Sequence, residues 1–109
     1  MTRNEAVVAL VNEWSATFLD KNADYGSSYL LTGQTLALWF PEGIVIDSPL
    51  KMIFVGLLAR MLDKLMRASN LVLRGKKEQV VDEKAYVTMG DLGNYGFMTA
   101  ELLKNGVAK

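Results

Sequence analysis

The sequence predicts an all-α protein with a single domain, residues 1–109. Three observations predict this class. Three long segments carry apolar residues at helical spacing, residues that favour helix ends bound each of them, and 109 residues fit one domain. We therefore expect a small bundle of three main helices with one irregular connection.

The first helix is predicted at about residues 3–20. Its apolar residues recur at helical spacing and are Val7, Val8, Val11, Trp14 and Phe18. Thr2 and Glu5 have the spacing of a capping box, which marks a helix start. We expect the helix to fade near Asn22, and Gly26 is a stop signal.

The connection at 27–48 is ambiguous in the sequence. Pro41, Glu42 and Gly43 form a turn between two apolar stretches, LALWF and IVID. This pattern fits a short β-hairpin, and it equally fits an irregular excursion after a short helix. Periodicity does not separate the two alternatives.

Two longer helices are predicted after this connection. The first covers 49–74, with Ser48 as its N-cap and Pro49 in its first turn, and Gly75 ends it. The last helix is predicted at about 79–104. The middle helix is apolar almost all round, and three helices offer too few neighbours to cover it. We therefore expect a homo-oligomer, a dimer or a tetramer.

Composition excludes several kinds of site and partner. The chain has no cysteine and no histidine, which excludes disulfides, an imidazole base and zinc sites built from these residues. A bound metal would need oxygen ligands, as Mg²⁺, Mn²⁺ and Ca²⁺ do. The formal net charge is zero, so we expect neither a nucleic acid nor a membrane as partner. The N-terminal residues lack a signal-peptide pattern, so we expect a cytoplasmic protein.

A charged stripe runs along the predicted helix 49–74. Arg60, Asp63, Lys64 and Arg67 are spaced i, i+3, i+4 and i+7, so they lie on one face. In a helix that is otherwise apolar, this face lines a cavity or forms a solvated set of ion pairs. Both alternatives are compatible with the spacing.

The last helix carries a second polar stripe, which contains Glu83, Val87, Asp91 and Asn94. Glu83 is near the helix start, where the macrodipole favours a carboxylate, whereas Asp91 is in mid-helix. Three glycines, at 90, 93 and 96, each destabilise this helix by about 0.5–1 kcal/mol relative to alanine. Close packing of another helix, or the approach of a ligand, would compensate for them.

An antiparallel hairpin of the two long helices would bring these stripes together. Cations beside carboxylates suit a phosphate ligand with Mg²⁺, the carboxylates holding the metal and the cations the phosphate oxygens. The same residues suit a buried network of ion pairs without a ligand.

Three motifs of the chain resemble a known family. K-x-x-D-Y-G occurs at 21–26, and G-x-x-x-R-x-x-D-K-x-x-R-x-x-x-L at 56–71. D-E at 82–83 is followed by T-x-x-D-L-x-x-Y at 88–95. Together they resemble the nucleotide modification associated domain family, first type, which is frequent in phages. That family is similar to the all-α, MazG-like NTP pyrophosphohydrolases.

The resemblance implies a nucleotide ligand and assigns residues to it. In MazG-like enzymes, acidic residues on adjacent helices bind Mg²⁺, and the metal activates water for attack between the α and β phosphates. The resemblance implies metal-binding and catalytic roles for Asp63, Glu83 and Asp91. It implies a nucleotide site containing Lys21, Asp24, Tyr25, Arg60, Lys64, Arg67 and Tyr95. The chain departs from the family at Val87, where the family usually has an aspartate, and this weakens the metal site.

Three hypotheses for the function follow. The first is a Mg²⁺-dependent (d)NTP pyrophosphohydrolase of phage nucleotide metabolism. The second is a non-catalytic protein that sequesters a nucleotide in a phage–host conflict and acts in the bacterial cytoplasm. The third is a structural oligomerisation module in which the stripes form ion pairs. The departure at Val87 favours the second hypothesis over the first.

Overall fold

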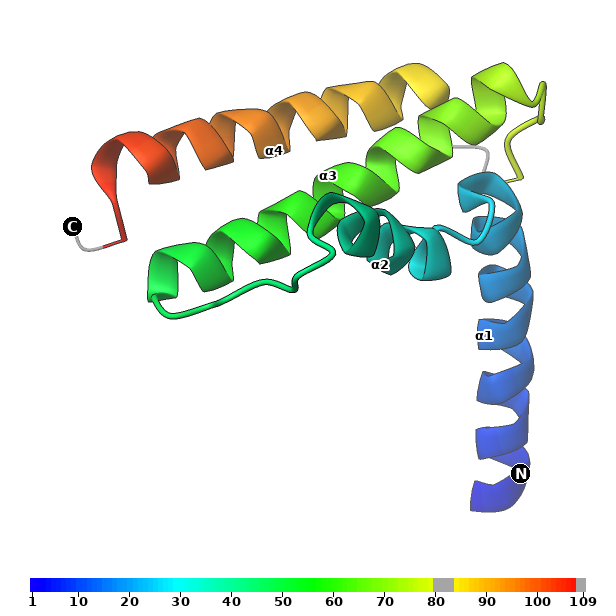
Figure 1. Ribbon diagram of the computed structural model, residues 1–109. Helices are drawn as coiled ribbons and strands as arrows, with labels where there is room; N and C mark the ends of the chain where they lie inside the picture. Colours follow the sequence, from blue (N-terminus) through cyan, green and yellow to red (C-terminus); the bar gives the residue numbers. More distant parts are fainter. Residues whose placement is uncertain (80–83, 108–109) are drawn as a thin grey trace.

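The computed structural model describes residues 1–79 and 84–107, which form four helices (Figure 1). These are α1 (Arg3–Tyr25), α2 (Ser28–Trp39), α3 (Pro49–Leu73) and α4 (Ala85–Asn105). The predicted all-α class is confirmed. The described residues contain no strand, so the hairpin alternative for 27–48 is wrong. A fourth helix, α2, occupies the first part of that segment.

Local signals place the helix ends. Thr2 and Glu5 form the predicted capping box, with hydrogen bonds of 3.1 and 2.7 Å between side chain and backbone. Ser48 Oγ accepts a hydrogen bond from Lys51 N at 3.2 Å at the start of α3, as predicted. Helix α1 extends beyond the predicted end to Tyr25. It stops at Gly26, which has a left-handed backbone conformation with φ of 61°.

The helix α4 begins later than predicted, at Ala85 instead of residue 79. The backbone N–H of Gln79 donates to Asp24 Oδ1 at 2.8 Å, and that of Ala85 donates to Glu78 Oε1 at 3.2 Å. Hydrogen bonds from its own backbone N–H and from that of Ala85 hold the pKa of the Glu78 carboxyl below its usual value. The predicted site residue Glu83 is outside the described residues.

The antiparallel pair α3 and α4 forms the centre of the molecule, and α1 and α2 pack on α3 (Figure 1). The buried apolar core is small and includes Leu62, Ala68 and Leu71 of α3 and Leu102 of α4. Helix α1 touches this body only near its C-terminal end and projects away from it (Figure 1). No helix among the described residues is long and apolar enough to cross a membrane.

Candidate functional site

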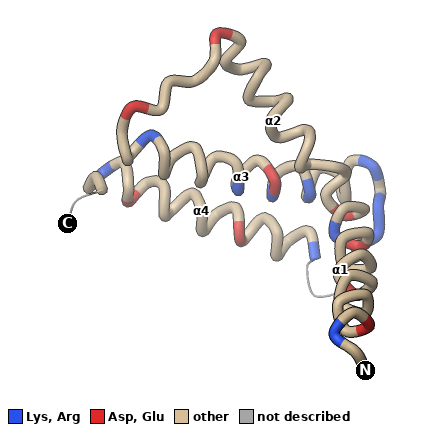
Figure 2. The backbone as a smooth tube through the Cα atoms, turned by 90° about the horizontal axis from the view of Figure 1, so that it is seen from below, with Lys and Arg blue, Asp and Glu red and all other residues tan. Residues whose placement is uncertain are grey.

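The charged stripe of α3 faces the polar stripe of α4, as the sequence predicted for an antiparallel hairpin. Successive turns pair Arg67 with Thr88 through a hydrogen bond, and Lys64 with Asp91 through an ion pair of 3.6 Å. One turn further, the Arg60 guanidinium lies 5.8 Å from the centre of the Tyr95 ring. In Figure 2, charged positions recur along the part of α3 that runs beside α4. The contact between the two stripes thus changes from a hydrogen bond at Arg67, through an ion pair at Lys64, to a cation–π contact at Arg60.

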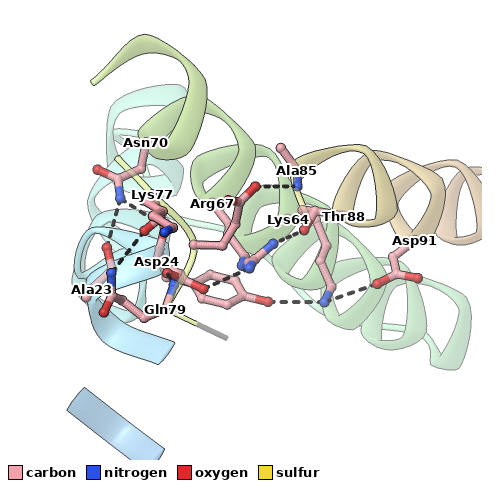
Figure 3. A network of polar contacts seen from close by, with 12 residues as sticks. Ala23, Asp24, Lys64, Arg67, Asn70, Lys77, Gln79, Ala85, Thr88 and Asp91 are labelled. Atoms are coloured by element: carbon pink, nitrogen blue, oxygen red, sulfur yellow. Dashed lines mark hydrogen bonds and ion pairs between the residues drawn. The ribbon is translucent and has the colours of Figure 1, made fainter. Parts of the chain in front are cut away.

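The Arg67 end of the stripe is buried. Arg67 Nη2 donates to Asp24 Oδ2 at 2.8 Å, and the two side chains are 0% and 1% exposed. Asp24 also accepts from the backbone of Gln79, and Arg67 donates to Thr88, so both members of the ion pair have further hydrogen bonds (Figure 3). These additional hydrogen bonds offset part of the free-energy cost of removing the two charges from water.

The resemblance implied a nucleotide site that contains Asp24 and Arg67, and in the structure both side chains are fully buried. Asp24 and Arg67 lie inside the protein and join the end of α1 to α3. Neither side chain can contact a ligand unless this network opens. We therefore regard them as positioning residues.

Asn70 reinforces the same junction. Its Nδ2 donates to the backbone oxygens of Ala23 and Asp24, both at 2.9 Å (Figure 3). These carbonyl groups belong to the last turn of α1, where carbonyl oxygens have no backbone N–H of the same helix to accept from. Asn70 therefore holds α1 on α3, and it is 5% exposed. Asn70 is not among the residues predicted for the site, although its position three residues after Arg67 extends the stripe.

Lys64 occupies the middle of the stripe, at the edge of the buried network. Its Nζ is 3.1 Å from Tyr25 Oη and 3.6 Å from Asp91 Oδ2 (Figure 3). The Tyr25 ring lies 5.8 Å from Lys64 Nζ and 5.7 Å from Arg67 Cζ, within the range of cation–π attraction. The side chain of Lys64 is 19% exposed and that of Asp91 is 46% exposed. This part of the stripe is open to solvent.

Arg60 lies at the open end and is exposed. Among the residues that the structure describes, it forms no ion pair, and its contact with Tyr95 is the only interaction found for it. A guanidinium group on a half-buried aromatic ring keeps its five N–H donors available for an anion.

Asp63 is turned towards another element. Its Oδ1 accepts a hydrogen bond from Thr32 Oγ1 of α2 at 2.8 Å, and Thr32 is buried. At least one oxygen of the Asp63 carboxylate is thus engaged by α2, on which the predicted site has no residue. Thr32 could not be singled out from the sequence, because periodicity does not distinguish the two alternatives for 27–48.

Of the three predicted Mg²⁺ ligands, Asp63 and Asp91 have other partners in the structure, and Glu83 is outside the described residues. No group of three acidic side chains within residues 1–79 and 84–107 lies close enough to hold a metal ion. Asp91 is beside the Lys64 ammonium group, and Asp63 is hydrogen-bonded to Thr32. Val87 is half-buried one turn before Asp91, and its side chain offers no oxygen ligand.

Lys21, which the resemblance assigned to the nucleotide site, is exposed near the end of α1.

Comparisons of the chain with family models, with curated proteins and with solved structures found no match. The contacts at the junction of α1, α3 and α4 are therefore the basis for a functional proposal.

Proposed function

We propose that the protein binds a nucleotide at the open end of the α3–α4 stripe and does not hydrolyse it, which is the second of the hypotheses above. The observation that carries the proposal is the position of Arg60. This exposed cation lies on the Tyr95 ring, without an ion-pair partner among the described residues and one turn from Lys64. Two cations one turn apart suit two oxygens of one phosphate chain.

The chemistry of the surrounding residues supports a nucleotide over a simple anion. The rings of Tyr25 and Tyr95 are both half-buried and flank the two cations. An aromatic ring offers a face for stacking of a base, and cations beside it provide contacts with phosphate. Asp24 and Arg67 hold Tyr25 and the end of α1 in place beneath this surface.

A panel of nucleotides tests the proposal. We expect at least one ribo- or deoxynucleotide to raise the melting temperature without Mg²⁺. A ligand at 100 times its Kd adds about 2.7 kcal/mol to the free energy of unfolding. The panel contains mono-, di- and triphosphates of each base, each measured with and without Mg²⁺, with inorganic phosphate and pyrophosphate as controls. A flat panel in calorimetry and thermal shift would contradict the proposal.

The variant Arg60→Gln is expected to weaken binding of the best nucleotide about tenfold or more. A charge-assisted hydrogen bond contributes about 1.5–3 kcal/mol, and about 1.4 kcal/mol corresponds to a factor of ten. Lys51→Gln is the matched control, because Lys51 is an exposed cation on the same helix that pairs with Asp47 at 2.8 Å. Calorimetry compares the two Kd values. Equal effects would mean that general charge, not Arg60, determines affinity.

Mg²⁺-dependent hydrolysis of a nucleoside triphosphate remains the second candidate function. One observation favours it: the Asp91 carboxylate faces the cationic stripe. If the stripe held the phosphates of a nucleotide, a Mg²⁺ ion bound to those phosphates could also be bound by this carboxylate. Asp91→Asn distinguishes the two candidates. If the cations hold the nucleotide, removal of this nearby carboxylate leaves the Kd unchanged or lowers it in the absence of Mg²⁺. Loss of both binding and pyrophosphate release in Mg²⁺ would support the enzyme instead.

A further inference from the structure

The chain exposes far more surface than a folded monomer of its mass. Its accessible surface is 7903 Å², whereas a compact monomer of 12.1 kDa has about 6,000 Å². The radius of gyration is 17.3 Å, against about 13 Å for a compact domain of 100 residues. This excess of surface is matched by exposed large apolar side chains on every helix.

Helix α1 contributes a continuous part of this apolar surface. Four side chains on one side of it remain about half exposed or more: Val7 60%, Val11 49%, Trp14 61% and Phe18 53%. Within the described chain, every residue of α1 up to Lys21 is exposed, and the helix projects from the body (Figure 1). A lone helix with an uncovered apolar side is marginal in water, because packing supplies most of the stability of a helix.

We propose that α1 pairs antiparallel with α1 of a second copy of this chain. The four apolar residues follow each other at intervals of four, three and four, which is the spacing of the seam of a two-stranded coiled coil. Glu5, Glu13 and Asp20 lie on the opposite side of α1, where they stay in water. The seam is therefore free of charge along its centre.

The sizes of the side chains favour the antiparallel direction. An antiparallel pair centred between Val11 and Trp14 places each Trp14 against Val11 of the other copy, and each Phe18 against Val7. Large residues then face small ones, which keeps the distance between the helices uniform. A parallel pair would set the two tryptophans against each other and the valines against each other. Antiparallel macrodipoles also attract.

The whole chain has an excess of roughly 1,900 Å² of surface, compared with the 800 Å² or so that each partner buries in a standard interface. The apolar side of α1 supplies one part of this excess, and exposed apolar residues of the other helices supply the rest. Under two-fold symmetry, the same apolar stripe of each copy contacts that of the other copy, so no second kind of surface is needed. This proposal does not depend on nucleotide binding.

The mass in solution tests the pairing. In light scattering without nucleotide, we expect the wild-type chain at twice 12.1 kDa at micromolar concentration. Val11→Glu places a charge in the seam and is expected to shift the mass to that of the monomer. Asn12→Glu is the matched control, because it adds the same charge on the adjacent residue, away from the seam. A monomeric wild type, as when α1 folds back on its own body, would overturn the proposal, as would a dimeric Val11→Glu.

Disulfide cross-linking tests whether the two α1 helices are antiparallel. The chain has no native cysteine, so only the introduced cysteines can be oxidised. The antiparallel register places Asn4 of one copy beside Lys21 of the other, so a mixture of Asn4→Cys and Lys21→Cys chains should oxidise to a mixed dimer. Each variant alone should stay reduced, because its two cysteines are about 25 Å apart along the helices. Cross-linking of each variant alone, without the mixed product, would show a parallel pair and overturn the proposal. Circular dichroism confirms that the variants remain helical.

Discussion

Replacement of Arg67 with methionine is expected to lower the free energy of unfolding by about 3–5 kcal/mol, the largest effect predicted for a single residue of this protein. The substitution leaves Asp24 buried without its cation, and it also removes the hydrogen bond to Thr88. Chemical denaturation followed by circular dichroism, at one fixed protein concentration, measures the change. Arg60→Met on the same helix is the control, and since Arg60 is exposed we expect less than about 1 kcal/mol.

A second substitution shows whether the lost ion pair is the cause. Asp24→Asn keeps an acceptor for the backbone of Gln79 and removes the buried charge. The double variant with Arg67→Met should be more stable than the sum of the single changes implies, by about 1 kcal/mol or more. Simple additivity would mean that the two side chains contribute separately. If Arg67→Met were as stable as wild type, the buried network would not hold the fold together.

Replacement of Gly26 with alanine is expected to lower the free energy of unfolding by about 2–4 kcal/mol. Gly26 has a φ of 61°, which is unfavourable by about 1–2 kcal/mol for a residue with a side chain. The added Cβ would also lie 2.9 Å from Asn70 Oδ1, so Asn70 must move. That movement strains its two hydrogen bonds to the last turn of α1, each of which contributes about 0.5–1.5 kcal/mol.

Gly75 offers a matched control for this prediction. It has nearly the same φ, 63°, and open space where a Cβ would lie. Gly75→Ala therefore carries only the conformational cost of about 1–2 kcal/mol. The difference between the two variants in thermal or chemical unfolding measures the contribution of the Asn70 contact. Equal costs at the two positions would show that Asn70 does not anchor α1.

The two ends of the α3 stripe correspond to two of the hypotheses that the sequence left open. At Arg67 the stripe is a buried network of ion pair and hydrogen bonds, and its effect is on stability. At Arg60 it is an exposed cation on an aromatic ring, and its effect is predicted on ligand binding. Lys64 lies between them and contacts Tyr25 and Asp91. Variants at the two ends therefore separate folding from binding.

Much of the secondary structure was determined by the sequence alone. The capping box at Thr2, the cap at Ser48 and the stop at Gly26 were predicted because each signal acts through hydrogen bonds within four residues. The spacing of the α3 stripe and its antiparallel partner on α4 were predicted for a similar reason, since periodicity places residues on one face of a helix. For helix α2, a short helix was only one of two alternatives, because its apolar residues lack a clear helical period.

Only the tertiary structure decided which members of the stripe are buried and which are open. Arg67 lies inside because Asp24, 43 residues earlier in the chain, meets it there together with Thr88. Asp63 accepts a hydrogen bond from Thr32 of α2, a helix that the pattern gave only as one of two alternatives. The start of α4 at Ala85 likewise depends on contacts of Glu78 and Gln79. Local spacing gives the face of a helix on which a residue lies, but burial and charge pairing depend on the elements that cover that face.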